Sequence, residues 1–126
     1  MKKWSMLFAL AMPAAFACGV CVEDKVAATY DYAVLQRALT HGQVVVFCEL
    51  RGRADAARVR QAAARVPALD AGSVRVSADP AAVSFALDAR SSPLLAVAQL
   101  QRGMPAGTHL TILRLATVNG LEMVAR

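Results

Sequence analysis

Residues 43–50 narrow the choice of fold more than any other stretch of the chain. Three valines and a phenylalanine follow one another from Val44 to Phe47, and the run stays apolar through Cys48, up to Glu49. Successive side chains of a strand point to opposite faces of its sheet, so a strand of this composition is apolar on both faces. We therefore expect a central strand that is covered on both sides.

A single helix is predicted over residues 22–40, directly before that strand. Apolar residues recur at helical spacing from Val22 to Val34, two acidic residues lie in the first turn, and a glycine follows the last turn. Val45 and Phe47 would point away from the helices that come later in the chain. The first helix is therefore the candidate cover for the face to which these two residues belong.

The rest of the chain alternates between helices and strands. A helix rich in alanine is expected over residues 54–66, a β-hairpin over residues 73–88, a helix from the Ser92-Pro93 pair to Gly103, and a strand over residues 109–115. Apolar and polar residues alternate in the hairpin, which predicts one face open to water. A serine cap before a proline is a typical helix start.

The order after the first helix is strand, helix, strand, strand, helix, strand. Two such units give the ferredoxin-like α+β sandwich, in which helices cover one face of a four-stranded antiparallel sheet. The expected fold is this βαββαβ sandwich over residues 43–116, preceded by an extra N-terminal helix. Residues 18–42 would hold a Cys-x-x-Cys pair and that helix. Residues 117–126 would be a tail, either a short extra strand or disordered.

The first seventeen residues predict an export signal. Two lysines precede an apolar run over residues 4–14, and residues 15–17, Ala-Phe-Ala, form a small-x-small cleavage site. Cleavage after Ala17 would make Cys18 the first residue of a periplasmic protein.

Two alternatives to simple cleavage remain open. The first is an uncleaved membrane anchor, although the apolar run is shorter than the roughly 20 residues that a span needs. The second is a lipid anchor on Cys18, which would turn its thiol into a thioether. The residues before Cys18 lack the usual branched aliphatic residue and include the bulky Phe16.

Composition argues against two classes of partner. The formal net charge is +5, but two of the positive charges belong to the export signal, and the arginines are scattered without interleaved aromatic residues. Nucleic-acid binding is therefore not expected. No later apolar stretch approaches membrane length, so no span is expected after cleavage.

The distinctive chemistry of the chain lies in its three cysteines. Cys18 and Cys21 stand three apart at the opening of a helix, where free backbone N–H groups favour thiolates, and two thiolates suit Cu(I) or another soft metal ion. Cys48 lies in the apolar strand and is expected to be a small buried filler. Four other soft or borderline side chains are not assigned as ligands: His41, His109, Met104 and Met123.

Residues 44–115 resemble a heavy-metal-associated domain, the ferredoxin-like module of copper chaperones and metal-transporting ATPases. The likeness is best over residues 69–76 and 82–88 and in the helix that ends at Gly103. It implies soft-metal handling through a Cys-x-x-Cys in the loop after the first strand. Here that loop holds no cysteine, and the pair comes one helix earlier. Metal binding is implied only if the displaced pair does the same job.

Three functions remain open on this basis. The first is an exported protein that captures or relays Cu(I) through Cys18 and Cys21. The second is a non-catalytic interaction module with a structural disulfide and an unidentified protein partner. The third, the only enzymatic one, is thiol–disulfide exchange, although the pair lies at a chain end rather than after a strand. Hydrolysis and phosphoryl transfer lack their motifs.

Overall fold

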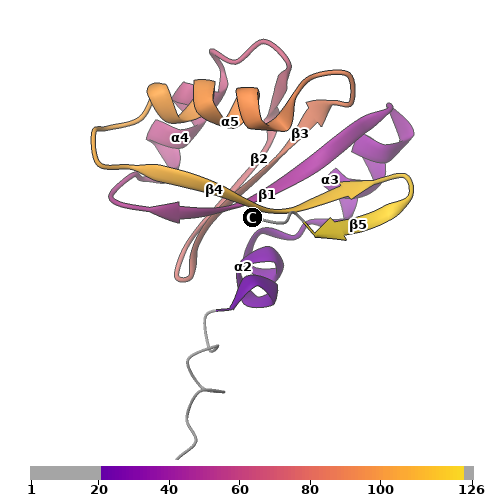
Figure 1. Ribbon diagram of the computed structural model, residues 1–126, viewed down its shortest axis with the longest axis horizontal. Helices are drawn as coiled ribbons and strands as arrows, with labels where there is room; N and C mark the ends of the chain where they lie inside the picture. The colour runs from indigo at the N-terminus through magenta and orange to yellow at the C-terminus, as the bar shows by residue number, and fades with distance from the viewer. Residues whose placement is uncertain (1–20, 124–126) are drawn as a thin grey trace, which may run out of the picture.

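The computed structural model describes residues 21–123, which place helices on both faces of one sheet (Figure 1). In chain order the elements are α2 (Val22–Thr29), α3 (Tyr32–Thr40), β1 (Gln43–Arg51), α4 (Ala56–Ala63), β2 (Leu69–Ala78), β3 (Ala81–Asp88), α5 (Pro93–Arg102), β4 (His109–Thr117) and β5 (Gly120–Met123). The strands pair antiparallel in the order β2-β3-β1-β4-β5. The predicted α+β class and the ferredoxin-like βαββαβ order are confirmed.

β1 is the central strand because it pairs with β3 on one side and with β4 on the other. Val46, for example, lies opposite Phe85 of β3 and Leu115 of β4. β5 extends the sheet beyond β4 through a tight turn in which Thr117 lies opposite Gly120. Of the two expectations for the tail, the extra strand is therefore the one found over the residues described.

The helices α4 and α5 cover one face of the sheet and enclose the larger core. Val46 of β1 lies there with Phe85 and Leu87 of β3, and none of the three is exposed to solvent. Val59 of α4 and Leu100 of α5 belong to the same cluster and are equally buried. Because full burial of each large apolar side chain contributes roughly 1.5–3 kcal/mol, this layer is the main source of stability.

The helices α2 and α3 cover the opposite face, on the side of the sheet away from α4 and α5 (Figure 1). Val26 of α2 and Ala38 of α3 pack there with Val45, Phe47 and Ala116 of the sheet, and all five are buried. The predictions that β1 is covered on both faces and that the N-terminal helical segment lies over the second face are therefore confirmed.

The prediction of one helix over residues 22–40 is wrong, because Tyr30 and Asp31 separate two helices. Asp31 has extended backbone angles, φ −139° and ψ 111°, and its carboxylate accepts hydrogen bonds from two first-turn amides of α3 at 3.0 and 3.2 Å. The other carboxylate oxygen pairs with Arg75 of β2 at 3.0 Å. An N-cap residue leaves helical geometry to satisfy such amides, so the chain bends here.

The hairpin also differs from its prediction, since β3 has no face open to water. Residues 82–87 are all buried, because α2 covers the face that the alternation assigned to solvent. Ser84 on that face donates a hydrogen bond to the backbone oxygen of Thr29 at 3.2 Å. β2 begins at Leu69, before the predicted start, and Ser73 in its irregular stretch accepts a hydrogen bond from a backbone amide of β3 at 2.7 Å.

The two helices of the main core have clear N-caps. α4 is shorter than the predicted 54–66 at both ends: Asp55 accepts from the amide of Arg58 at 2.8 Å and starts the helix after itself, and the helix ends at Ala63 with Ala64 as its C-cap. α5 begins as predicted, with Ser92 accepting from the amide of Leu95 at 3.2 Å. No helix between residues 21 and 123 is long and apolar enough to cross a membrane.

Phe47→Ala tests whether α2 and α3 are an integral layer of the fold. The ring lies under these helices and is 2% exposed, so its removal is expected to lower the free energy of unfolding by about 3–5 kcal/mol, as measured by urea denaturation. Val118→Ala truncates an apolar side chain that is 73% exposed and is expected to change stability by less than about 0.5 kcal/mol. If both substitutions changed the free energy of unfolding equally little, α2 and α3 would not be an integral layer of the fold.

Asp31 is expected to make the free energy of unfolding depend on pH. The hydrogen bond from Arg75, and then the amide of Val34, hold the pKa of Asp31 below its ordinary value of 3.8. A carboxyl with a lower folded-state pKa stabilises the protein above its unfolded pKa, and this contribution is lost as pH falls through the folded pKa. Asp31→Asn keeps a capping side chain but cannot titrate. We expect wild type to be the more stable at pH 6, with the difference shrinking below about pH 4.

The measurement for Asp31 is urea denaturation of both proteins across that pH range. Asp31→Ala, which removes the cap as well, is expected to have a lower free energy of unfolding than Asp31→Asn at every pH. A stability difference between wild type and Asp31→Asn that stays constant on acidification would refute the role assigned to the Arg75 pair.

Candidate functional site

Cys21, one member of the predicted thiol pair, lies directly before α2 as its N-cap residue. Its carbonyl oxygen accepts hydrogen bonds from the amides of Asp24 and Lys25 at 3.1 and 3.2 Å, which begin the helix. The side chain is partly exposed, and its sulfur lies 3.9 Å from a carboxylate oxygen of Asp24. Cys18 lies outside the described residues, so the pairing of the two thiols remains a prediction.

Two ion pairs fasten α2 to the sheet just after Cys21. Glu23 accepts a hydrogen bond from Arg114 of β4 at 2.6 Å, and Lys25 lies 3.5 Å from Glu49 of β1. The hydrogen bond from Arg51, and the charge of Lys25, hold the pKa of Glu49 below its ordinary range. Together with the buried Val26, these contacts place the thiol on a helix that is fixed to the sheet.

The acidic residues of the first turn have different surroundings. The carboxylate of Glu23 is paired with Arg114, whereas Asp24 directs its carboxylate towards the sulfur of Cys21. Acids in this position interact favourably with the partial positive charge of a helix N-terminus. A cation bound at the sulfur would also be attracted by this carboxylate.

Cys48 has none of these properties. It is 1% exposed and belongs to the core under α4 and α5, on the opposite face of β1 from α2. Burial raises the pKa of the Cys48 thiol to about 12, so the thiol stays protonated at neutral pH. The prediction that Cys48 is a buried apolar filler is confirmed.

The structure describes three of the other soft side chains, and it places them apart. His41 caps the C-terminus of α3, with its Nδ1 atom 2.7 Å from the carbonyl oxygen of Arg37, and His109 is exposed at the start of β4. Met104 is buried in the main core. Met123 ends β5, and its side chain lies outside the described part of the structure. Within residues 21–123 there is no group of three or more His, Cys, Asp or Glu side chains that could hold a metal ion.

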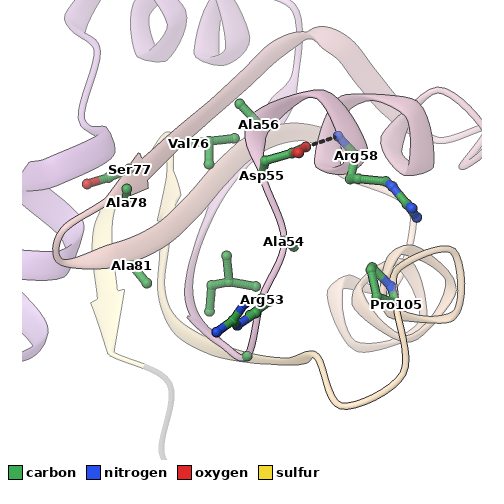
Figure 2. A pocket seen from close by; sticks show the side chains of 12 residues that line it. Arg53, Ala54, Asp55, Ala56, Arg58, Val76, Ser77, Ala78, Ala81 and Pro105 are labelled. Atoms are coloured by element: carbon green, nitrogen blue, oxygen red, sulfur yellow. Dashed lines mark hydrogen bonds between the residues drawn. The ribbon is translucent and has the colours of Figure 1, made fainter.

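A second candidate site is a cavity of about 660 Å³ at the point where β1 leads into α4 (Figure 2). It is bounded by the β1–α4 loop, the end of the β2–β3 hairpin and the α5–β4 loop. The cavity is open to solvent on one side. Its lining residues are Leu50, Gly52, Arg53, Ala54, Asp55, Ala56, Arg58, Val76, Ser77, Ala78, Ala81 and Pro105. The sequence predicts only a turn over residues 51–53 and does not predict this cavity.

Gly52 lets two loops meet at the rim of the cavity. Its φ of +101° is in the region that favours glycine, and a Cβ atom there would lie 2.5 Å from the carbonyl oxygen of Gly107. Thr108 donates a hydrogen bond to the backbone oxygen of Arg53 at 3.4 Å. Gly52 before Arg53 was thus a signal that a glycine-dependent loop carries a charged side chain towards the start of α4.

Comparisons of the chain with protein-family models, with curated proteins and with solved structures found no match. The likeness to heavy-metal-associated domains therefore stays a prediction beyond the shared ferredoxin-like topology. The loop that holds the thiols in that family corresponds here to the rim of the cavity, and its residues 49–54 are without cysteine.

The two described thiols are expected to react very differently with iodoacetamide. Cys21 is partly exposed and should be alkylated in the reduced native protein, whereas Cys48 should react only after unfolding, because it is buried and protonated. Peptide mass spectrometry after a timed reaction measures both residues, and Cys48→Ala is expected to leave labelling of Cys21 unchanged. Native labelling of Cys48 at the rate of Cys21 would contradict the structure.

Proposed function

We propose that this protein is exported and captures a soft metal ion, Cu(I), through the thiolates of Cys18 and Cys21. The observation that carries the proposal is the position of Cys21, a partly exposed thiol at the N-terminus of a helix that two ion pairs attach to the sheet. A ligand on such a fixed element keeps its position when the metal arrives, which lowers the ordering cost of binding.

Each residue near the pair has a distinct part in the proposal. Cys21 is the fixed ligand, and Cys18 completes the pair from the preceding segment. Soft thiolates select Cu(I) over hard ions such as Mg²⁺ or Ca²⁺. Asp24, whose carboxylate faces the sulfur, adds negative charge that favours a bound cation.

Relay of the ion to another protein is part of the same proposal. A Cu(I) ion held at the tip of α2 would remain accessible to thiols of a partner, because Cys21 is at the surface and not inside the fold. Exchange between thiolate pairs needs that access. The buried Cys48, on the other face of β1, would take no part.

An interaction module is the second candidate, and the exposed tyrosines at the bend between α2 and α3 favour it. Tyr30 is 49% and Tyr32 is 65% exposed. Tyrosine is enriched in protein–protein interfaces because it combines a large apolar ring with a polar tip. A partner that binds here would do so whether or not the cysteines are present.

The test is a titration of the reduced protein with Cu(I) against a competing chelator. The protein is expressed with its own leader in a Gram-negative bacterium, and intact mass first reports cleavage after Ala17 and any lipid on Cys18. We expect one tightly bound Cu(I) per chain in wild type. Binding should be lost in Cys18→Ser/Cys21→Ser, since both ligands are removed.

Cys48→Ala is the matched control, since it also removes a thiol, but one that is buried in the core under α4 and α5. It is expected to bind Cu(I) as tightly as wild type. Equal weak binding by wild type and the Cys18→Ser/Cys21→Ser variant would refute the metal proposal, and retained partner capture by that variant would then favour the interaction module. A leader that stays attached would refute export by cleavage.

A further inference from the structure

We propose that the cavity between the β1–α4 loop and the β2–β3 hairpin binds a small organic anion, an apolar body that carries a carboxylate or phosphate group. This site is separate from Cys21, which is not among its lining residues. The volume of about 660 Å³ lies within the range of roughly 300–1,000 Å³ that is typical of small-molecule sites.

The floor of the cavity is suited to an apolar body. Leu50 of β1, Val76 of β2 and Ala81 of β3 are apolar lining residues, and Pro105 adds a fourth from the loop after α5. Several of the remaining lining residues are alanines, whose small side chains leave the space open. An alkyl chain or ring placed there would exchange contact with water for contact with these groups, which is favourable in proportion to the area covered.

The charged side chains of the lining are suited to an anionic group. Arg53 and Arg58 come from the two sides of the α4 N-terminus, and in Figure 2 the side chain of Arg58 extends towards Pro105. Neither arginine takes part in any of the salt bridges formed within residues 21–123. Guanidinium groups bind carboxylates and phosphates in a bidentate way, and Figure 2 shows these two on different sides of the cavity, so each is available to pair with such a head group.

Asp55 is the acidic residue of the lining, and its charge is already engaged. Its carboxylate accepts a hydrogen bond from the amide of Arg58 at 2.8 Å and caps α4. Two arginines and one aspartate leave the lining with a formal net charge of about +1, and the Asp55 carboxylate lies at the helix start, where it offsets the partial positive charge of the helix N-terminus. The neighbouring Arg51 is paired with Glu49 at 2.9 Å and belongs to the sheet surface, not to the lining.

Contacts between two loops form the rim of the cavity in the absence of a ligand. Gly52 is packed against Gly107, and Thr108 is hydrogen-bonded to the backbone of Arg53. These contacts join the loop that carries Arg53 to the loop that follows α5. A preformed site loses less entropy on binding than a site that must be assembled.

The experiment is a titration of the ¹⁵N-labelled protein, purified after expression with its own leader, with three probes of equal chain length. These are sodium octanoate, octyl phosphate and 1-octanol. We expect saturable shifts of the amide signals of Gly52, Ala56 and Ala78 with octanoate or octyl phosphate, and a much weaker response to the uncharged alcohol. The anionic probe that binds more tightly identifies the head group.

Arg53→Gln/Arg58→Gln is expected to weaken binding of the preferred anion about tenfold or more, because both guanidinium partners are lost. Arg60→Gln/Arg102→Gln is the matched control, since it removes the same charge from exposed positions outside the lining, and it should bind like wild type. Cys18→Ser/Cys21→Ser should also bind like wild type, so this result is independent of the metal proposal.

Three results would overturn the anion site. One is the absence of saturable shifts at these amides with either anion. Another is an equal response to 1-octanol, which would mean that charge is not recognised. The last is equal weakening in the Arg53→Gln/Arg58→Gln variant and in its control, which would mean that only the overall charge of the protein matters.

Discussion

The packing of α2 and α3 on the second face of the sheet is the interaction on which the other features of the structure depend. Val45 and Phe47 of β1 point to this face, and without a cover two large apolar side chains of the central strand would meet water. Val26 and Ala38 supply that cover. Because α2 is held there, Cys21 at its start has a fixed position, and the ion pairs to the sheet can form.

Much of this architecture could be predicted from the sequence. The apolar run from Val44 to Phe47 predicted a strand covered on both faces. The order of elements predicted the ferredoxin-like sandwich, because that order follows from hydrophobic periodicity together with local cap and turn residues. The break at Asp31 could not be read in the same way. Its cap competes with an apolar pattern that continues across it, and its bond to Arg75 joins residues far apart in the sequence. The packing of α2 over β3 could not be predicted either, because it depends on tertiary contacts such as the hydrogen bond from Ser84 to Thr29.

The two candidate sites differ in how much of each could be predicted from the sequence. The role of Cys48 followed from its apolar neighbours, and the start of α2 at Cys21 followed from the acidic first turn. The cavity did not follow, because its lining is assembled from three connections that are distant in the sequence. Gly52 and Arg53 were visible in the sequence, but their meeting with Pro105 and the hairpin around one cavity is a property of the fold. The protein thus has two surfaces with distinct chemistry, a thiol at the tip of α2 and a basic cavity at the start of α4.

If the helical layer over the second face is a rigid part of the fold, Cys21 has a fixed place at its start. Backbone ¹⁵N order parameters measured across residues 22–40 test this rigidity most directly. Values of about 0.85 are expected through α2 and α3, equal to those of the sheet, as for rigid backbone. Values below about 0.6 in these helices, beside a rigid sheet, would contradict it, since α2 would then move independently of the strands that it is meant to cover.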